Sequence, residues 1–173
     1  AVRRGERLAF AAPPLVRSGA LSPQDTADVG SALGLDPADV LEMAWVDNGP
    51  GWVGILLRPP DAVLTADPDP GRCRGIKAGL VAPYLPAPRD DGVAAEVRAF
   101  YSDGREFAED PVTGSLNAGL AQWLVPAGHL PHRYVAAQGT VIGRDGRVHV
   151  YVVDGVVWVC GATHTVVVGE RQA

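Results

Sequence analysis

Glu109-Asp110-Pro111-Val112-Thr113-Gly114-Ser115 is the stretch that decides the fold, because it joins an extended segment to the most apolar helix predicted in the chain. Asp110 precedes Pro111, and a residue before proline is pushed toward extended backbone. The Ala- and Leu-rich segment 115–125 follows directly and ends at Pro-Ala-Gly, so a helix is predicted there. Its apolar residues lie on more than one face, which predicts a helix that is buried on most sides.

Short Val-rich runs on both sides of this helix are broken by Gly, Pro, Asp and Asn, a pattern typical of strands joined by tight turns. Strands are expected over residues 8–11, 42–46, 52–57, 79–84, 94–101, 134–137, 140–142, 147–153, 156–160 and 163–168. A second helix is expected from Ser22, as its N-cap, to about Gly34. Asp154-Gly155 predicts a type I′ hairpin turn. The sequence therefore predicts an α+β fold, a strand-rich curved sheet or barrel wrapped around a central buried helix.

Composition and charge exclude several classes of function. The chain has 173 residues, 47% of them hydrophobic, which fits a single domain over residues 1–173 with a real core. Its formal net charge of -5 argues against nucleic acid and against an anionic membrane surface as partners. No apolar run reaches the about 18 residues of a membrane-spanning helix, and the opening lacks the pattern of a signal peptide. We therefore expect a cytoplasmic protein without a metal site, in which Cys73 and Cys160 are reduced thiols.

The start of the predicted helix is a candidate site for an anion. The backbone N–H groups of Thr113, Gly114 and Ser115 would point outward, and the helix dipole adds positive potential there. Asp110 would lie beside the bound anion, where a carboxylate holds its proton more tightly and suits acid–base work. Asp, Thr and Ser before a helix are also ordinary capping residues, and local physics alone favours that interpretation.

The same stretch, with Asn117-Ala118-Gly119-Leu120 after it, resembles the second-half motif of the PhzF-like phenazine biosynthesis family. The flanking segments that agree are Phe10-Ala11-Ala12-Pro13-Pro14, Asn48-Gly49-Pro50-Gly51-Trp52, Val97-Arg98-Ala99-Phe100, Gln138-Gly139, Gly146-Arg147-Val148 and Val157-Trp158-Val159-Cys160-Gly161. The resemblance runs from Leu8 to Glu170 and is expected to involve the family's C-terminal half only.

This resemblance implies the fold of diaminopimelate epimerase, in which two pseudo-symmetric halves, each a sheet around a central helix, enclose the active site between them. The implied site residues are Asp110 as the catalytic group, and Thr113, Gly114, Ser115, Asn48 and Gly49 as substrate-binding residues. The implied chemistry is isomerisation of a small carboxylate-bearing molecule by proton transfer, without a cofactor. Neither cysteine lies near Asp110, where the epimerase branch has a cysteine, so a thiol-based racemase is disfavoured.

The family's catalytic glutamate and its Gly-Gly-His-type motif have no counterpart in this sequence. Gly128-His129 follows a helix instead of preceding one, and His132, His149 and His164 are interpreted as ordinary surface or strand residues. Three alternatives stay open: a piece of a longer protein, one subunit of a split enzyme, or a lone half that works as a non-catalytic binding or interaction module. An N-terminal half is thus an expected partner, in the same chain or as a separate one, and a homodimer is a further possibility.

Overall fold

The fold consists of one curved sheet and three helices among the residues that the structure describes, which are 2–4, 7–102, 106–164 and 166 of a computed structural model. The strands are β1 (Val2–Arg4), β2 (Arg7–Ala11), β3 (Arg17–Ala20), β4 (Val40–Asp47), β5 (Val53–Leu57), β6 (Lys77–Pro83), β7 (Ala95–Ser102), β8 (Phe107–Asp110), β9 (Arg133–Gln138), β10 (Gly146–Val153) and β11 (Val156–Ala162). The helices are α1 (Pro23–Ala32), α2 (Pro60–Thr65) and α3 (Gly114–Leu124).

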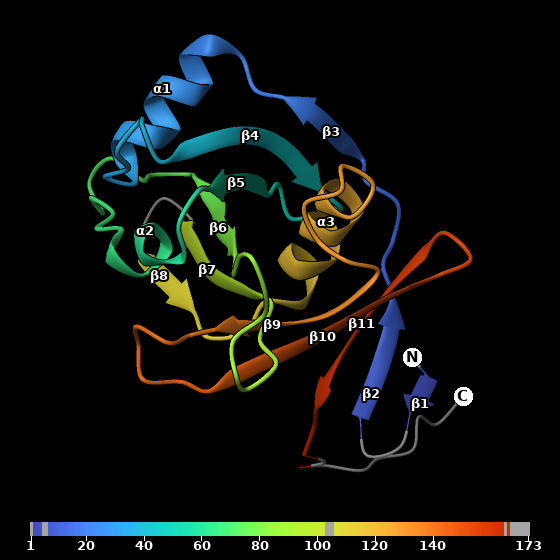
Figure 1. Ribbon diagram of the computed structural model, residues 1–173. Coiled ribbons are helices and arrows are strands. Elements are labelled where there is room, and N and C mark those ends of the chain that lie inside the picture. The colour runs from blue at the N-terminus through green and yellow to red at the C-terminus, as the bar shows by residue number, and fades with distance from the viewer. Residues whose placement is uncertain (1, 5–6, 103–105, 165, 167–173) are drawn as a thin grey trace.

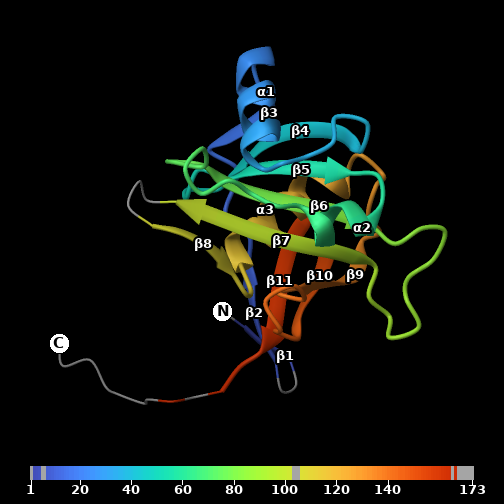
Figure 2. The same ribbon diagram turned by 90° about the vertical axis from the view of Figure 1, so that its left-hand side faces the viewer.

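The strands form a single 11-stranded sheet in the order β1-β2-β11-β10-β9-β7-β6-β5-β4-β3, with β8 paired to β7 beside this path. Neighbouring strands are antiparallel except for the pairs β5–β6 and β7–β9, which are parallel. The sheet curls so that its two arms, β4–β5 and β10–β11, lie on opposite sides of α3 (Figures 1 and 2). The predicted α+β fold, a curved sheet around a central buried helix, is confirmed.

The inner core lies between the sheet and α3. Leu116, Leu120 and Leu124 of this helix are fully buried, and the helix contacts β4, β5, β10 and β11. The helix can approach so closely because Gly119 has no side chain where the carbonyl of Val46 comes nearest. A helix that is apolar all round is stable only when it is enclosed, and here the sheet encloses it.

A second core lies on the outer face of β4–β7, where α1 and α2 cover the sheet. It contains large buried side chains from the C-terminal end of helix α1 and from the strands, among them Leu33, Ile55, Leu57 and Leu80. Helix α1 begins as predicted, because the side chain of Ser22 accepts a hydrogen bond from the N–H of Asp25 at 3.1 Å. None of the helices in the described part of the chain is long and apolar enough to cross a membrane.

Two of the predicted strands differ in the structure. Residues 140–142 form a turn instead of a strand, because Gly139 and Gly143 adopt positive φ on either side and the N–H of Gly143 donates to the carbonyl of Thr140. Of the range 163–168, the described residues lie outside any strand, and the others lie outside the described part. The turn at Asp154-Gly155 is confirmed, since both residues have positive φ and Val153 pairs with Val156. The sequence did not predict β1, β3, α2 or β8.

Candidate functional site

Strand β8 and helix α3 meet at the stretch that opened the sequence analysis. β8 ends at Asp110, so the predicted extended backbone before Pro111 is confirmed. Pro111 and Val112 are exposed, Thr113 is the N-cap, and α3 begins at Gly114. Asp110, half-buried, therefore lies one short loop away from the positive end of the buried helix.

The hydroxyl of Thr113 is directed at Asp110 and not at the helix. Thr113 Oγ1 donates to Asp110 Oδ2 at 2.8 Å, and the Thr113 side chain makes no capping hydrogen bond. A capping threonine would instead accept from an N–H of the first helical turn. Capping alone therefore does not account for Thr113, and the contact fixes one oxygen of the Asp110 carboxylate.

The buried amide of Gln138, at the end of β9, holds this corner together. Its Oε1 accepts from the N–H of Thr113 at 3.1 Å and from Asn117 Nδ2 at 2.8 Å. Its Nε2 donates to the carbonyl of Asp110 at 2.8 Å and to Thr113 Oγ1 at 2.9 Å. All four hydrogen-bonding positions of the amide are thus used, which is expected for a side chain with 0% exposure. We refer to Asp110, Thr113, Asn117 and Gln138 as the Gln138 network.

Removing the hydroxyl of Thr113 tests how much this network contributes. We expect Thr113→Val to lower the free energy of unfolding by about 1–3 kcal/mol, because a hydrogen bond to a carboxylate is lost in a buried setting. Urea unfolding followed by circular dichroism measures the change. Thr113→Ser keeps the hydroxyl and is the control for the lost methyl group; no loss of stability in Thr113→Val would show that the hydroxyl does not hold the network.

The loop between β4 and β5 packs against the first turn of α3. Asn48 Nδ2 donates to the carbonyl of Ser115 at 2.8 Å, and Trp52 Nε1 donates to Ser115 Oγ at 3.0 Å. Gly49 lies in the same loop, but it is exposed and its N–H donates to Asp47 Oδ1. The structure thus brings Asn48 to the helix start, whereas Gly49 makes no hydrogen bond to it among the described residues.

The N–H groups at the start of α3 differ in whether the protein already uses them. The N–H of Thr113 is committed to Gln138, while those of Gly114 and Ser115 have no hydrogen-bond acceptor among the described residues. Beside Gly114 is a cavity of about 260 Å³, lined mainly by apolar side chains that include Phe10 and Val112. The ring of Phe10 would be 3.2 Å from a Cβ at Gly114, so glycine permits this close approach. Two free N–H groups at a helix start next to a cavity can donate hydrogen bonds to an anionic group.

Other residues predicted from the sequence lie elsewhere. Asp110 and Ser115 do not line this cavity in the described structure, although the loop and helix turn that carry them adjoin it. His129, His132 and His164 are exposed, and none of them forms a hydrogen bond with the Gln138 network. Cys73 and Cys160 are both buried; Cys73 lies elsewhere, whereas Cys160 is the exception in this group and lines the cavity beside Gly114. Among the described residues there is no group of three or more side chains placed to hold a metal ion.

Sequence reasoning missed the residues that organise the site. Gln138, Trp52 and Phe10 reach the start of α3 from β9, from the end of the β4–β5 loop and from β2. Their partners lie 25, 63 and roughly a hundred positions away along the chain, and such contacts leave no local pattern. A buried Gln-Gly pair at a strand end was visible, but its partners were not.

Comparison with known sequences gives a match over nearly the whole chain. The sequence model of the family described as phenazine biosynthesis-like protein (PhzC-PhzF) matches residues 2–169. This corrects the expectation of a likeness to a C-terminal half only. The chain is also 42% identical over 62 residues to the uncharacterized isomerase YddE of Escherichia coli, a match that covers 30% of this chain and 21% of that protein.

Solved structures with a similar fold include proteins described as members of the PhzF family. The protein from Enterococcus faecalis has a TM-score of 0.68 at 21% identity, covering 92% of this chain and 55% of that chain. The Bacillus anthracis protein has a TM-score of 0.65 at 17% identity, covering 90% and 57%. A protein described as a predicted epimerase from Pseudomonas aeruginosa gives 0.62 at 20% identity, covering 93% and 57%. At these identities the likeness shows the fold, and the chain spans a little more than half the length of these structures.

Proposed function

The chain belongs to the phenazine biosynthesis-like (PhzC-PhzF) family, and on this premise we propose that it is one lobe of a cofactor-independent isomerase. The proposed reaction is proton transfer on a small carboxylate-bearing molecule. The name of the Escherichia coli relative, an uncharacterized isomerase, agrees with this class of reaction. The E. faecalis and B. anthracis structures carry the family name without naming a substrate.

One observation supports the proposal most directly: a carboxylate and an open helix start lie on the same short loop. Asp110 is held by the hydroxyl of Thr113, and the N–H groups of Gly114 and Ser115 are available a few residues further on. A substrate carboxylate bound at these N–H groups would be close to an acid–base group. Asn48 would orient the first helical turn through Ser115, so its role would be to position the site.

The proposal includes a second lobe, in the same gene product or in a separate chain. Acid–base isomerisation uses a group that removes a proton and another that returns it. The Asp110 carboxylate supplies one such group, and the second lobe would supply the other across a shared cleft. The length of the solved relatives, of which this chain covers 55–57%, leaves room for such a lobe.

A specific observation also favours a second candidate, a binding or interaction module without catalysis. Large apolar side chains surround the cavity at the start of α3 and remain accessible: Leu8 is 41% exposed, Phe10 37% and Val112 48%. Apolar residues gathered beside a cavity are typical of surfaces that another protein surface or a ligand covers. A second lobe would cover them in either case.

Deuterium exchange distinguishes the two candidates. The full-length gene product, with any chain that co-purifies with it, is incubated in D₂O with small carboxylates that carry a C–H next to a carbonyl or carboxyl group. We expect deuterium to enter at least one of them at carbon, as seen by NMR and mass spectrometry, because removal and return of a proton exchange it with solvent.

The control is the same incubation with protein that has been denatured by heat. A carboxylate that binds, as measured by calorimetry, without any exchange would contradict the isomerase and support the binding module. If no carboxylate of the panel were bound and none exchanged deuterium, the isomerase would be contradicted, and so would a module that binds small carboxylates.

A further inference from the structure

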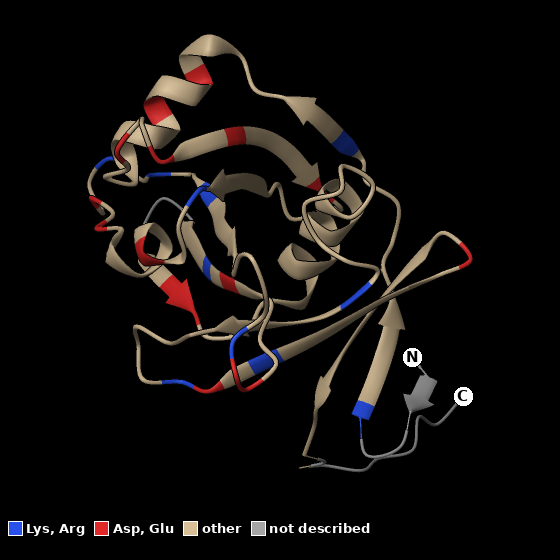
Figure 3. Cartoon of the chain, in the orientation of Figure 1, with Lys and Arg blue, Asp and Glu red and all other residues tan. Residues whose placement is uncertain are grey.

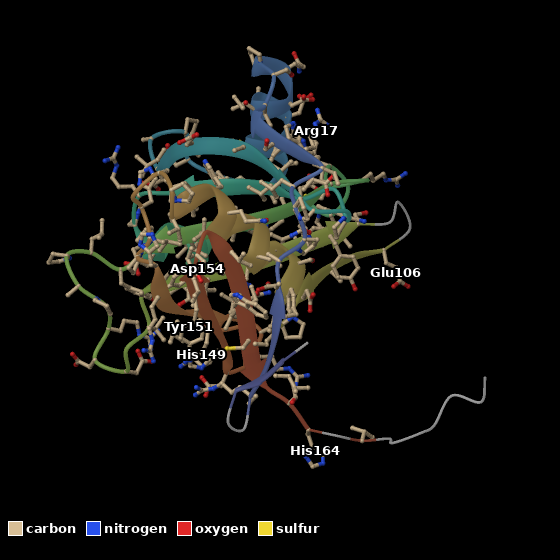
Figure 4. All side chains as sticks on the ribbon, turned by 90° about the vertical axis from the view of Figure 1, so that its right-hand side faces the viewer. Arg17, Glu106, His149, Tyr151, Asp154 and His164 are labelled. Atoms are coloured by element: carbon tan, nitrogen blue, oxygen red, sulfur yellow. The ribbon has the colours of Figure 1, made fainter. Side chains whose placement is uncertain are left out.

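The outer face of strands β2, β9, β10 and β11 carries a second group of polar side chains, away from α3. Side chains alternate along β10, so Val148 and Val150 are buried against the inner core while His149 and Tyr151 point the other way. Figure 4 shows His149 and Tyr151 one after the other on the same side of this strand. The groove on this face is lined by other residues than the cavity at the start of α3. The two adjoin, because Arg147 and Cys160 of the same strands line that cavity and a further hollow is lined by Arg7 and His149 together with Pro111 and Val112.

The register of the sheet brings two arginines to the same face. Arg133 of β9 is directly opposite Tyr151, and its guanidinium lies 5.1 Å from the centre of that ring. Arg7 of β2 is opposite Ala162 of β11. Ala162 lies two residues after Cys160, which is opposite His149, so Arg7 and His149 are on the same face of the sheet. Figure 3 shows the basic positions on β2, β9 and β10 that result.

These side chains line a groove of about 360 Å³. Its lining includes Arg7, Arg133, Val135, His149 and Tyr151, and the loop at Gly92 closes one side. We call it the β9–β10 groove. Its volume lies at the lower end of the range for small-molecule sites, roughly 300–1,000 Å³.

The charge of the groove is of one sign. No Asp or Glu lines it among the described residues, and neither Arg7 nor Arg133 has an ion-pair partner there. Arg147, on the same face, is different, because it already pairs with Asp91 at 3.3 Å and with Asp145 at 2.8 Å. Among the described residues, two guanidinium groups without an ion-pair partner therefore face this groove, in a chain whose net charge is -5.

The surroundings of His149 lower the pKa of its side chain. Burial lowers the pKa of its imidazole, and the positive charges of Arg7 and Arg133 lower the pKa further. The other titratable groups on this face are Tyr151 and Arg147 of the same strand and Cys160 opposite. Asp91, Arg144 and Asp145 line an adjoining hollow that His149 and Arg7 also line. An anion placed between the arginines would reverse the electrostatic part of this effect.

We propose that the β9–β10 groove binds a small oxyanion with at least two negative charges, a dicarboxylate or a phosphate. The guanidinium groups of Arg7 and Arg133 would hold one anionic group each, or share a phosphate, since both geometries suit the planar fork of arginine. His149 would donate a third hydrogen bond between them. This site is additional to the proposed carboxylate site at the start of α3 and does not depend on it.

The test is an NMR titration of the full-length protein at constant, low ionic strength, with inorganic phosphate in one arm and succinate in the other. We expect saturable shifts of the His149 imidazole signals with a dissociation constant of about 10 mM or tighter for at least one anion. The pKa of His149 should rise when the anion is bound, because the anion stabilises the imidazolium. The arm with the tighter binding identifies phosphate or dicarboxylate as the ligand class.

Variants make the assignment specific. Arg133→Gln and Arg7→Gln should each weaken binding about tenfold, because each removes a charge-assisted contact. Arg58→Gln, an exposed arginine between β5 and α2, should leave binding unchanged. Linear, non-saturating shifts with both anions would overturn the proposal, as would equal losses in Arg58→Gln and Arg133→Gln.

Discussion

Replacing Arg98 by alanine is expected to lower the free energy of unfolding by about 3–5 kcal/mol, because it leaves the Glu109 carboxylate buried without its cation. The side chains of Arg98 and Glu109 are only 6% and 9% exposed. Water can therefore solvate the remaining Glu109 carboxylate only to a small extent. This is the largest loss of stability among the substitutions that we predict, and urea unfolding followed by circular dichroism measures it.

The physical reason is that one guanidinium joins three elements. Arg98 of β7 binds both oxygens of Glu109 of β8, through Nε at 3.1 Å and a terminal nitrogen at 2.8 Å. Its other terminal nitrogen donates to the carbonyls of Val63 at 3.1 Å and Ala66 at 2.7 Å, where α2 ends. A helix end that is buried loses stability when its carbonyls have no donor. The substitution therefore removes the ion pair and the α2 contact together.

Two controls test whether the loss of stability comes from leaving a charge buried and not from replacing an arginine as such. Arg147→Ala should cost about 1 kcal/mol or less, since its partner Asp145 is 88% exposed and water screens the pair. Combining Arg98→Met with Glu109→Leu should recover part of the loss, because no charge is then left buried. A loss below 1 kcal/mol for Arg98→Ala would contradict the idea that this pair fixes β8.

Features that depend on neighbouring residues could be predicted from the sequence. The buried α3 followed from apolar residues on more than one face, and the turn at Asp154-Gly155 from a residue pair that tolerates positive φ. The N-cap at Ser22 is another local signal. Local signals also mislead: Val141 and Ile142 favour a strand by type, yet the turn between Gly139 and Gly143 places both on the surface.

Features that depend on distant residues could not be predicted. Gln138 joins Asp110, Thr113 and Asn117 across 21 to 28 positions, and Arg98 reaches α2 across more than 30. The strand β8 is short and, among the described strands, pairs with β7 alone, so its four residues carry no clear period. The candidate site could be located from the motif. The side chains that hold Asp110 in place could be identified only from the three-dimensional structure.

Replacing Asp110 by asparagine is expected to slow deuterium exchange into the substrate carboxylate by about 10²–10⁴-fold, the range that a general acid–base group contributes. This prediction rests on the proposed isomerase and is measured in the full-length gene product, with the carboxylate that exchanges fastest. Asparagine matches aspartate in size, and its carbonyl oxygen can still accept the hydrogen bond from Thr113 Oγ1. The fold and the substrate affinity should therefore change little, while the ability to take and return a proton is lost.

Asp145→Asn is the matched control, because it makes the same chemical change on the exposed turn between β9 and β10. If Asp110→Asn exchanged deuterium as fast as the unmodified protein while still binding the carboxylate, Asp110 would not be the acid–base group. If it exchanged slowly and also lost substrate affinity in proportion, the carboxylate would act through the order of the helix start instead. If the exchange rate fell while the substrate affinity stayed unchanged, Asp110 would carry out the proton transfer itself. A group that only positions α3 would alter binding by the same factor.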